Sequence, residues 1–288
     1  MLSPECPGGG MQYETEKATI DYELHGEGRP ILLLHGWTMD RRVEMDTYER
    51  IFATRPGWRR IYPDLPGMGR SVAKAGLKNQ DDMLAVLLQF IDHVLPSGRF
   101  LLGGTSGGGY LARAIAVRRR PRIAGLLLRV PAIIPDISRR TVPSFRALVR
   151  DDALMATLDA EERALLGDVI VQKRDYLETH GRRLRGLVQP AIEASAAVVL
   201  DIRADPRRYA VSFDLAEVEK GFEEPTLIVA ARQDMVVGYR DTWSILESYP
   251  RATFAMVDRA DHGWPLESHD LLGALVDDWL MRVAERGA

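Results

Sequence analysis

The 288-residue sequence has a single cysteine, no basic excess and no long apolar run. One cysteine, Cys6, cannot form an internal disulfide, and no Cys/His set has the spacing of a zinc site. Nothing therefore implies an oxidising compartment or a structural metal. Thirty-eight basic residues stand against 41 acidic ones, a formal net charge of −3, so a nucleic-acid or anionic-membrane partner is not expected. No apolar run approaches the ~18–20 residues that would span a membrane.

The amino-terminal residues 1–10 also lack the basic end and the apolar centre of a signal peptide. We therefore expect a cytoplasmic protein. The same residues are rich in proline and glycine, which predicts a flexible leader, and Met11 is a candidate start.

Short apolar runs alternate with helical stretches along most of the chain, which predicts a parallel sheet covered by helices on both faces. Residues 11–25 are typical of a hairpin of two short strands. Buried strands are expected at residues 31–34, 60–62, 100–102, 126–128, 226–231 and 253–257. Helices are expected at residues 42–54, 81–95, 110–119 and from about 268 to the end. The fold class is therefore α/β, with a core formed by residues 11–133 and 225–288.

Residues 134–224 break this alternation. They show helical patterns at 145–158, 161–174 and 184–200, without a clear strand. Because a structureless loop of that length is uncommon, we expect a helical cap inserted over one end of the sheet. Arginine clusters lie in and near this segment, and we interpret them as solvated helix ends and faces. They comprise Arg118, Arg119, Arg120 and Arg122; Arg139 and Arg140; and Arg182, Arg183 and Arg185.

The segment Gly104-Thr105-Ser106-Gly107-Gly108 matches the pattern G-x-S-x-G. A buried strand is predicted before it and a helix after it, so Ser106 falls on a sharp strand-to-helix turn with its hydroxyl at the helix amino terminus. Glycines two before and two after the serine let neighbouring chains pass closely. The alternative is an ordinary glycine-rich turn that holds phosphate, but no Gly-Lys-Ser/Thr follows.

A serine hydroxyl is a weak nucleophile near neutral pH and needs a base, which in turn needs a carboxylate to orient it. His262 follows the predicted strand 253–257, and Asp234 follows the predicted strand 226–231. We therefore expect Ser106, His262 and Asp234 to be the nucleophile, the base and the acid. The remaining histidines, including His35, lie in less suitable places, and Asp258 and Asp261 are the competing acids.

The chain resembles the α/β-hydrolase superfamily over nearly all of its length outside the leader and the cap. The resemblance rests on Leu34-His35-Gly36-Trp37, on Asp64-Leu65-Pro66-Gly67-Met68-Gly69-Arg70-Ser71, on the serine turn, and on Asp234 with His262. It implies the chain order Ser, Asp, His that is found here. It also implies that the backbone N–H groups of Trp37 and Gly107 form the oxyanion hole.

The function expected from these features is hydrolysis of a carboxylic ester, or a related acyl bond, of a small and apolar substrate through an acyl-enzyme. No metal or cofactor is implied. A carbon–carbon bond hydrolase, or another enzyme with the same triad, is the alternative. A ligand-binding receptor with slow or no turnover is a second one. Met39, Met68 and Met235 flank the expected site loops, where they either line the substrate pocket or pack beneath the loops. The sequence makes no prediction of the oligomeric state.

Overall fold

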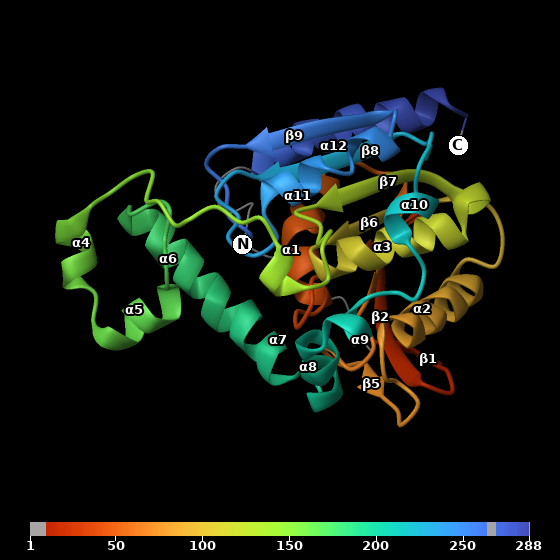
Figure 1. The fold of residues 1–288 in the computed structure, drawn as a ribbon. Helices are drawn as coiled ribbons and strands as arrows, with labels where there is room; N and C mark the ends of the chain where they lie inside the picture. Colours follow the sequence, from red (N-terminus) through yellow and green to blue (C-terminus); the bar gives the residue numbers. More distant parts are fainter. Residues whose placement is uncertain (1–9, 264–268, 288) are drawn as a thin grey trace.

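A computed structural model describes residues 10–263 and 269–287 of the chain, and a mixed β-sheet runs through its centre (Figure 1). Among these residues the strand order is β1-β2-β4-β3-β6-β7-β8-β9, and β5 pairs with β2. The strands are β1 (Met11–Glu14), β2 (Ala18–His25), β3 (Arg29–Leu34), β4 (Trp58–Pro63), β5 (Val72–Ala73), β6 (Phe100–Thr105), β7 (Ile123–Arg129), β8 (Thr226–Ala231) and β9 (Ala252–Val257).

The direction of the strands follows the expectation from the sequence. β1 and β2 form the predicted antiparallel hairpin, and β2 also pairs antiparallel with β4. Every pair from β4 through β3, β6, β7 and β8 to β9 is parallel. All residues of β6, β7 and β8 are buried, as expected for largely apolar strands covered on both faces. The α/β fold with a mostly parallel sheet is confirmed.

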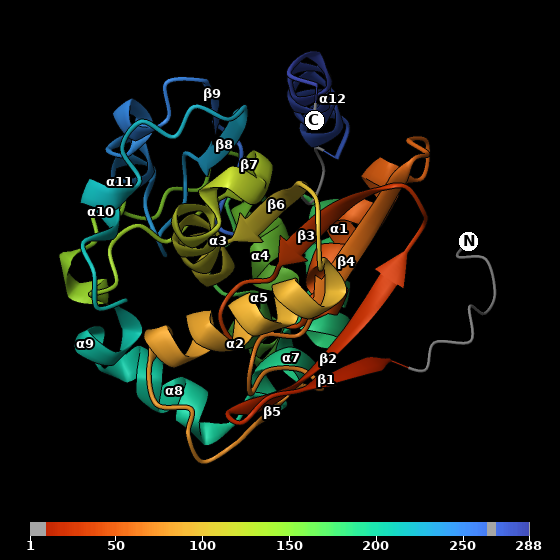
Figure 2. The same ribbon diagram turned by 90° about the vertical axis from the view of Figure 1, so that its right-hand side faces the viewer.

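Helices cover both faces of this sheet. α1 (Arg41–Phe52) and α12 (His269–Glu285) contact each other on one face, and α2 (Gln80–Val94) and α3 (Gly107–Arg118) contact each other on the opposite face (Figure 2). The Asp40 side chain caps α1 and the Asn79 side chain caps α2 by accepting hydrogen bonds from backbone N–H groups. The remaining core helices are η1 (Arg120–Arg122), α11 (Tyr239–Trp243) and η4 (Leu246–Ser248).

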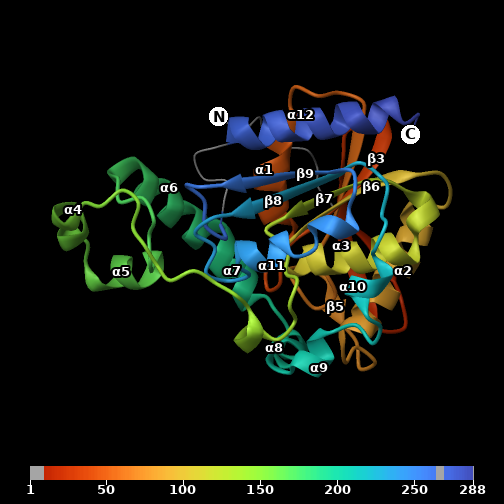
Figure 3. The same ribbon diagram turned by 45° about the horizontal axis from the view of Figure 1, so that its top comes forward.

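The segment between β7 and β8 is largely helical. Its elements are η2 (Ile137–Arg139), α4 (Asp152–Thr157), α5 (Ala160–Leu166), α6 (Arg174–Arg183), η3 (Leu184–Val188), α7 (Gln189–Glu193), α8 (Ala197–Ala204), α9 (Pro206–Tyr209) and α10 (Leu215–Val218). Figure 3 shows α4, α5 and α6 set apart from the sheet, with α6, η3 and α7 leading back toward it. No helix in the described part of the chain is long and apolar enough to cross a membrane.

Three helix predictions in this segment are corrected by the structure. Of residues 145–158, only Asp152–Thr157 form a helix, because the backbone before them pairs with residues 170–172 through a β-bridge between Val149 and Val171. The helix predicted over 161–174 ends at Gly167, whose φ of +59° leaves the helical region. The pattern over 184–200 is divided into a π-helical turn and two separate helices.

The segment also divides between two hydrophobic cores. Its first part has a small core of its own, built around Leu166, Ile170 and Tyr176. Its last part, from Val199 to Phe222, packs into the main core of the sheet and its helices. The first part is therefore held to the rest of the molecule by fewer apolar contacts than the last part.

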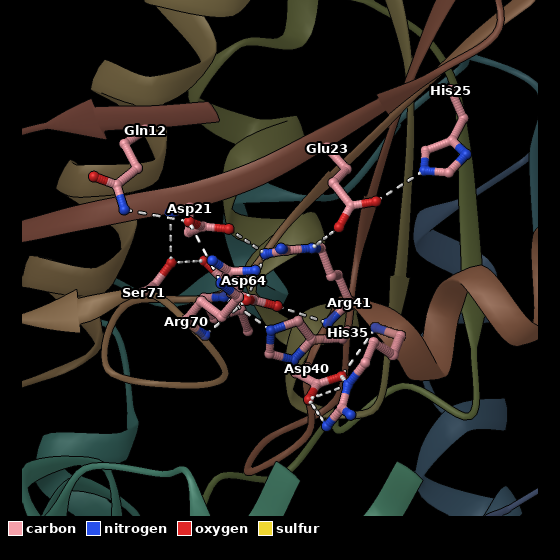
Figure 4. A network of polar contacts seen from close by, with 12 residues as sticks. Gln12, Asp21, Glu23, His25, His35, Asp40, Arg41, Asp64, Arg70 and Ser71 are labelled. Atoms are coloured by element: carbon pink, nitrogen blue, oxygen red, sulfur yellow. Dashed lines mark hydrogen bonds and ion pairs between the residues drawn. The ribbon is translucent and has the colours of Figure 1, made fainter. Parts of the chain in front are cut away.

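A buried polar network fixes the Asp64–Ser71 loop against the sheet (Figure 4). Nη1 of Arg41 lies 2.7 Å from Asp21 and 2.6 Å from Asp64, and its Nε donates to Glu23. The Ser71 hydroxyl donates to the carbonyl of Asp64 and accepts from the N–H of Asp21. Arg41 is therefore shared by Asp21 and Glu23 of β2 and by Asp64 of the loop, and it links the loop to the sheet.

Candidate active site

Ser106 occupies a strained turn between β6 and α3. Its φ of +53° is rare for a residue with a side chain and marks a backbone held by its surroundings. Its N–H donates to the carbonyl of Arg129 at 3.1 Å, and its carbonyl accepts from Tyr110 and Ala132 at 3.1 and 2.9 Å. These three hydrogen bonds join the serine to Arg129 at the end of β7, to Ala132 just after β7 and to the first turn of α3. They hold the serine in place.

Two glycines make this turn possible. A methyl group added at Gly104 would lie 2.4 Å from the carbonyl oxygen of Gly108, and one added at Gly108 would lie 2.3 Å from that of His35. Both distances are shorter than any contact a real side chain makes with backbone. The glycines two before and two after Ser106 are therefore required by the close approach of three backbone segments, as the sequence predicted.

Ser106, His262 and Asp234 come together in one hydrogen-bonded chain. Nε2 of His262 lies 2.9 Å from Oγ of Ser106, and Nδ1 of His262 lies 2.8 Å from Oδ2 of Asp234. The three residues follow β6, β9 and β8, whose carboxyl ends meet at one edge of the parallel sheet. Since the carboxylate accepts from Nδ1–H, Nε2 is the ring atom left to accept the serine proton.

Asp234 is held as a charged, oriented carboxylate. It is 1% exposed, and its Oδ1 accepts from the N–H groups of Val236 and Val237 at 2.8 and 2.9 Å. Burial acts to raise its pKa, but His262 and the two backbone N–H groups outweigh burial, and the pKa of Asp234 is lowered. The competing acid Asp261 instead accepts from the N–H of Gly263.

Two backbone N–H groups lie beside the serine without an acceptor. A Cβ added at Gly107 would lie 3.3 Å from the nitrogen of Trp37, so these backbones are close neighbours. In residues 10–263 and 269–287 neither N–H has a hydrogen-bond acceptor. Since buried N–H groups are nearly always paired, this pair is suited to an anionic oxygen supplied from outside the protein.

The Trp37 ring packs edge-on against Tyr209 of α9, with ring centroids 4.8 Å apart. It lines the cavity beside Ser106, and its Nε1 donates to the carbonyl of Val199 on α8 at 3.2 Å. His35, on the same loop, has a structural role, as the sequence suggested. Its Nε2 accepts from the N–H of Leu65 and its Nδ1 donates to the carbonyl of Gly36.

A cavity of about 410 Å³ opens in front of Ser106 and His262. This volume is within the ~300–1,000 Å³ range of small-molecule sites. Met39 and Met235 line it, but Met68 does not. Met68 is fully buried in the main core, so its expected place in the pocket is wrong: the loop that carries it turns it inward beneath the site.

Charged side chains that the sequence reasoning did not assign also line the cavity. Arg129 lies 3.1 Å from Glu44, and both are almost fully buried. Arg183 is 11% exposed, so the interpretation of its cluster as a solvated helix face is wrong for this residue. Arg183 is the last residue of α6, and the burial of its side chain depends on how α6 packs. The remaining charged lining residues are Asp168, Arg203 and Asp261, and His180 lines the cavity as well.

In the described part of the chain no group of three His, Cys, Asp or Glu side chains is placed to hold a metal ion.

Residues 31–274 match the alpha/beta hydrolase family. The chain belongs to that family. The match spans the serine turn, Asp234, His262 and the whole segment between β7 and β8.

Individual relatives of the chain differ in the reactions for which they are named. Haloalkane dehalogenase 2 of Mycobacterium tuberculosis is 34% identical over 120 residues, which is 40% of this chain and 40% of that protein. The chain therefore matches well under half the length of this curated relative. The pimeloyl-[acyl-carrier protein] methyl ester esterase of Legionella pneumophila is 24% identical over 91% of this chain and 99% of its own. The crystal structure of an alpha/beta superfamily hydrolase from Oenococcus oeni PSU-1 superposes with a TM-score of 0.80 at 25% identity, covering 95% of this chain and 99% of that one.

Proposed function

We propose that this protein is a serine hydrolase that cleaves a carboxylic ester, or a related acyl bond, of a small molecule. The observation that carries the proposal is the hydrogen-bonded chain from Ser106 through His262 to Asp234, beside two unpaired N–H groups in a cavity. These are the groups that acyl transfer needs: a nucleophile, a base, an orienting carboxylate and donors for an oxyanion.

In the first half-reaction, Oγ of Ser106 attacks the ester carbonyl while its proton moves to Nε2 of His262. Asp234 stabilises the imidazolium that forms, and the N–H groups of Trp37 and Gly107 bind the developing oxyanion. The intermediate then expels the alkoxide, which takes the proton from His262 and leaves as an alcohol. In the second half-reaction a water molecule gives its proton to His262 and attacks the carbonyl of the acyl-enzyme. The bond from the acyl carbon to Oγ then breaks, His262 returns the proton to Oγ of Ser106, and the acid leaves.

The rest of the proposal concerns the surroundings of these residues. Residues 134–224 act as a cap that supplies one wall of the cavity, because His180, Leu184 and Arg203 come from this segment. Met39 and Met235 supply apolar surface for an acyl or alkyl group. The reaction needs no metal or cofactor, and we place it in the cytoplasm.

The residue at position 106 bears on the relatives with other activities. An aspartate nucleophile would suggest a dehalogenase, whereas this chain has a serine held against a histidine. Esterase chemistry is therefore favoured over the activity in the name of the 34%-identical relative. A carbon–carbon bond hydrolase and a ligand-binding receptor are the alternatives that absence of ester hydrolysis would favour.

The test is release of p-nitrophenol from acetyl, butyryl and hexanoyl esters by wild type, Ser106→Ala and the matched exposed variant Ser138→Ala. We expect turnover by wild type and by Ser138→Ala, with loss of at least about a thousandfold in Ser106→Ala. Equal activity of wild type and Ser106→Ala would overturn the proposal. Absence of wild-type turnover, with a ligand-induced rise in thermal stability, would favour a receptor instead.

A further inference from the structure

Arg183 places a permanent positive charge in the wall of the cavity. It is the last residue of α6, it lines the cavity in front of Ser106, and its side chain is 11% exposed. A guanidinium does not lose its proton in proteins, so a buried arginine needs negative charge or strong acceptors around it.

The described residues supply this negative charge only in part. Nε of Arg183 lies 3.4 Å from Oδ2 of Asp46, and Nη1 lies 3.4 Å from the carbonyl oxygen of Gly263. Both are at the long limit for a hydrogen bond, whereas charge-assisted bonds are ordinarily ~2.7–2.9 Å. Asp46 is moreover shared with Arg50, at 3.0 Å. Among the described residues Arg183 has no closer acceptor.

The charges around Arg183 also indicate that its positive charge is incompletely balanced. Burial and, after it, the nearby charge of Arg129 lower the pKa of Arg183, although Asp46 and Glu44 act in the opposite direction. The acids on the cavity wall are otherwise occupied or solvated. Glu44 is bound to Arg129 and Thr105, and Asp168 is exposed. Asp261 accepts from the N–H of Gly263 and, against the effect of burial, acts to raise the pKa of His180.

A second polar group lies one turn earlier on the same helix. His180 also lines the cavity, and its buried Nδ1 has no hydrogen-bond partner in the described part of the chain. Directly after Arg183 the helix widens into the π-helical turn Leu184–Val188, and both ends of that turn line the cavity. Single π-helical turns within α-helices occur often at functional sites.

We propose that Arg183 binds a carboxylate at the end of the substrate remote from the ester, so that the substrates are half-esters of dicarboxylic acids. The proposal rests on the esterase function and extends it to a class of substrate. Nη1 of Arg183 contacts the residue that follows His262, so the carboxylate and the ester carbonyl share one cavity. The planar fork of the guanidinium suits a carboxylate, which it can bind through two parallel hydrogen bonds. Hydrolysis consumes water and yields the dicarboxylic acid and the free alcohol.

The test compares monomethyl esters of succinic, glutaric, adipic and suberic acids with their dimethyl esters, by alcohol release. Each pair has the same chain, and only the dimethyl ester lacks the remote charge. The proteins are wild type, Arg183→Gln, Arg183→Lys and the matched control Arg182→Gln, which changes the exposed neighbour on α6. Thermal unfolding of each variant shows that it is folded.

For at least one chain length we expect wild type to prefer the half-ester in kcat/KM, on the order of 10- to 100-fold, as for hydrogen bonds to a charged group. Arg183→Gln removes the preference mainly by raising KM for the half-ester, with little change for the diester. Arg183→Lys keeps part of the preference, because it keeps the charge and loses the fork. Arg182→Gln keeps all of it.

Other results would overturn the proposal while leaving the esterase function intact. One is Ser106-dependent hydrolysis of diesters with no preference for half-esters in wild type. A second is an equal loss on both ester classes in Arg183→Gln, which would mean that Arg183 only holds the cap against the catalytic loop. A third is loss of the preference in Arg203→Gln rather than Arg183→Gln.

Free adipate should inhibit diester hydrolysis by wild type; stronger inhibition by inorganic phosphate would mean that the anion is not a carboxylate. Absence of hydrolysis of every ester would instead contradict the esterase function.

Discussion

Two buried arginines differ in how closely negative groups surround their guanidinium groups. Arg113, on α3, donates to Glu219 through Nε and Nη2 at 2.8 and 2.7 Å, and Tyr249 donates to the same carboxylate at 2.7 Å. Arg183, on α6, has acceptors no closer than 3.4 Å within residues 10–263 and 269–287. Burial acts to lower the pKa of both, but Glu219 reverses this for Arg113, whose pKa is raised, while the pKa of Arg183 is lowered.

The difference distinguishes a buried charge that is paired within the protein from one that is available to bind a ligand. Nη1 of Arg113 also lies 3.4 Å from the carbonyl oxygen of Ala132, whose N–H is bound to the carbonyl of Ser106, so this closed pair adjoins the serine turn. Arg183 lines a cavity, and its guanidinium has no close acceptor in the described part of the chain. Changes at the closed pair should therefore act on folding, and changes around Arg183 should act on substrate selection.

The largest expected effect is at the closed pair. Glu219→Gln keeps the shape of the side chain and leaves Arg113 buried without its counter-charge. Breaking a buried pair in this way costs about 3–5 kcal/mol. We expect a loss of this size in the free energy of unfolding, measured by urea denaturation.

The matched control is Glu217→Gln, two residues away, whose partner Lys220 is exposed. Exposed pairs contribute roughly 0.2–1 kcal/mol, so this variant should unfold close to wild type. A loss in Glu219→Gln no larger than in the control would break the distinction between the two arginines.

A smaller effect is expected at Asp234, a buried carboxylate with a full set of partners. Because its pKa is lowered in the folded state by His262 and backbone N–H groups, against the effect of burial, its charge contributes stability at pH values above the unfolded pKa of about 3.9. This stability is lost as the pH falls through the lower, folded-state pKa. The difference in unfolding free energy between wild type and Asp234→Asn should therefore shrink as the pH falls below about 4, measured by urea denaturation. A difference that stays constant or grows would mean that the carboxylate is not stabilised in its charged form.

The smallest effect is expected at Asp46, which competes with the substrate carboxylate for Arg183. Asp46→Asn removes a partly exposed partner of the kind that contributes roughly 0.2–1 kcal/mol. We expect KM for the preferred half-ester to fall by about 1.5- to 5-fold, with KM for the diester unchanged. A rise in KM for the half-ester would show that Asp46 orients Arg183 rather than competing for it.

The sequence predicts those parts of the site that depend on residues close together in the chain. The serine turn could be predicted because its requirements are local: a buried strand, a helix and two glycines at fixed spacing. Asp234 and His262 were found because each follows a buried strand, and parallel strands bring their carboxyl ends to one edge. Their roles as acid and base stay predictions until the variants are measured.

Arg183 could not be found in this way. An arginine in the pattern Arg182-Arg183-Leu184-Arg185 is solvated or buried according to how its helix is packed, and nothing local fixes that. The helix limits in residues 145–200 failed for a related reason, because a tertiary β-bridge and a π-helical turn override the apolar periodicity. Met68 was misplaced because the sequence places its loop near the site but does not tell which side of the loop faces the cavity.

The most direct test of the central claim is to label the protein with a serine-reactive fluorophosphonate and map the adduct by peptide mass spectrometry. A nucleophile activated by His262 should react alone among the serines. We expect one adduct per chain, on Ser106, no adduct in Ser106→Ala, and strongly slowed labelling in a His262→Ala variant. An adduct on another residue, or labelling that persists at the same rate in Ser106→Ala, would contradict the assignment of Ser106 as the nucleophile.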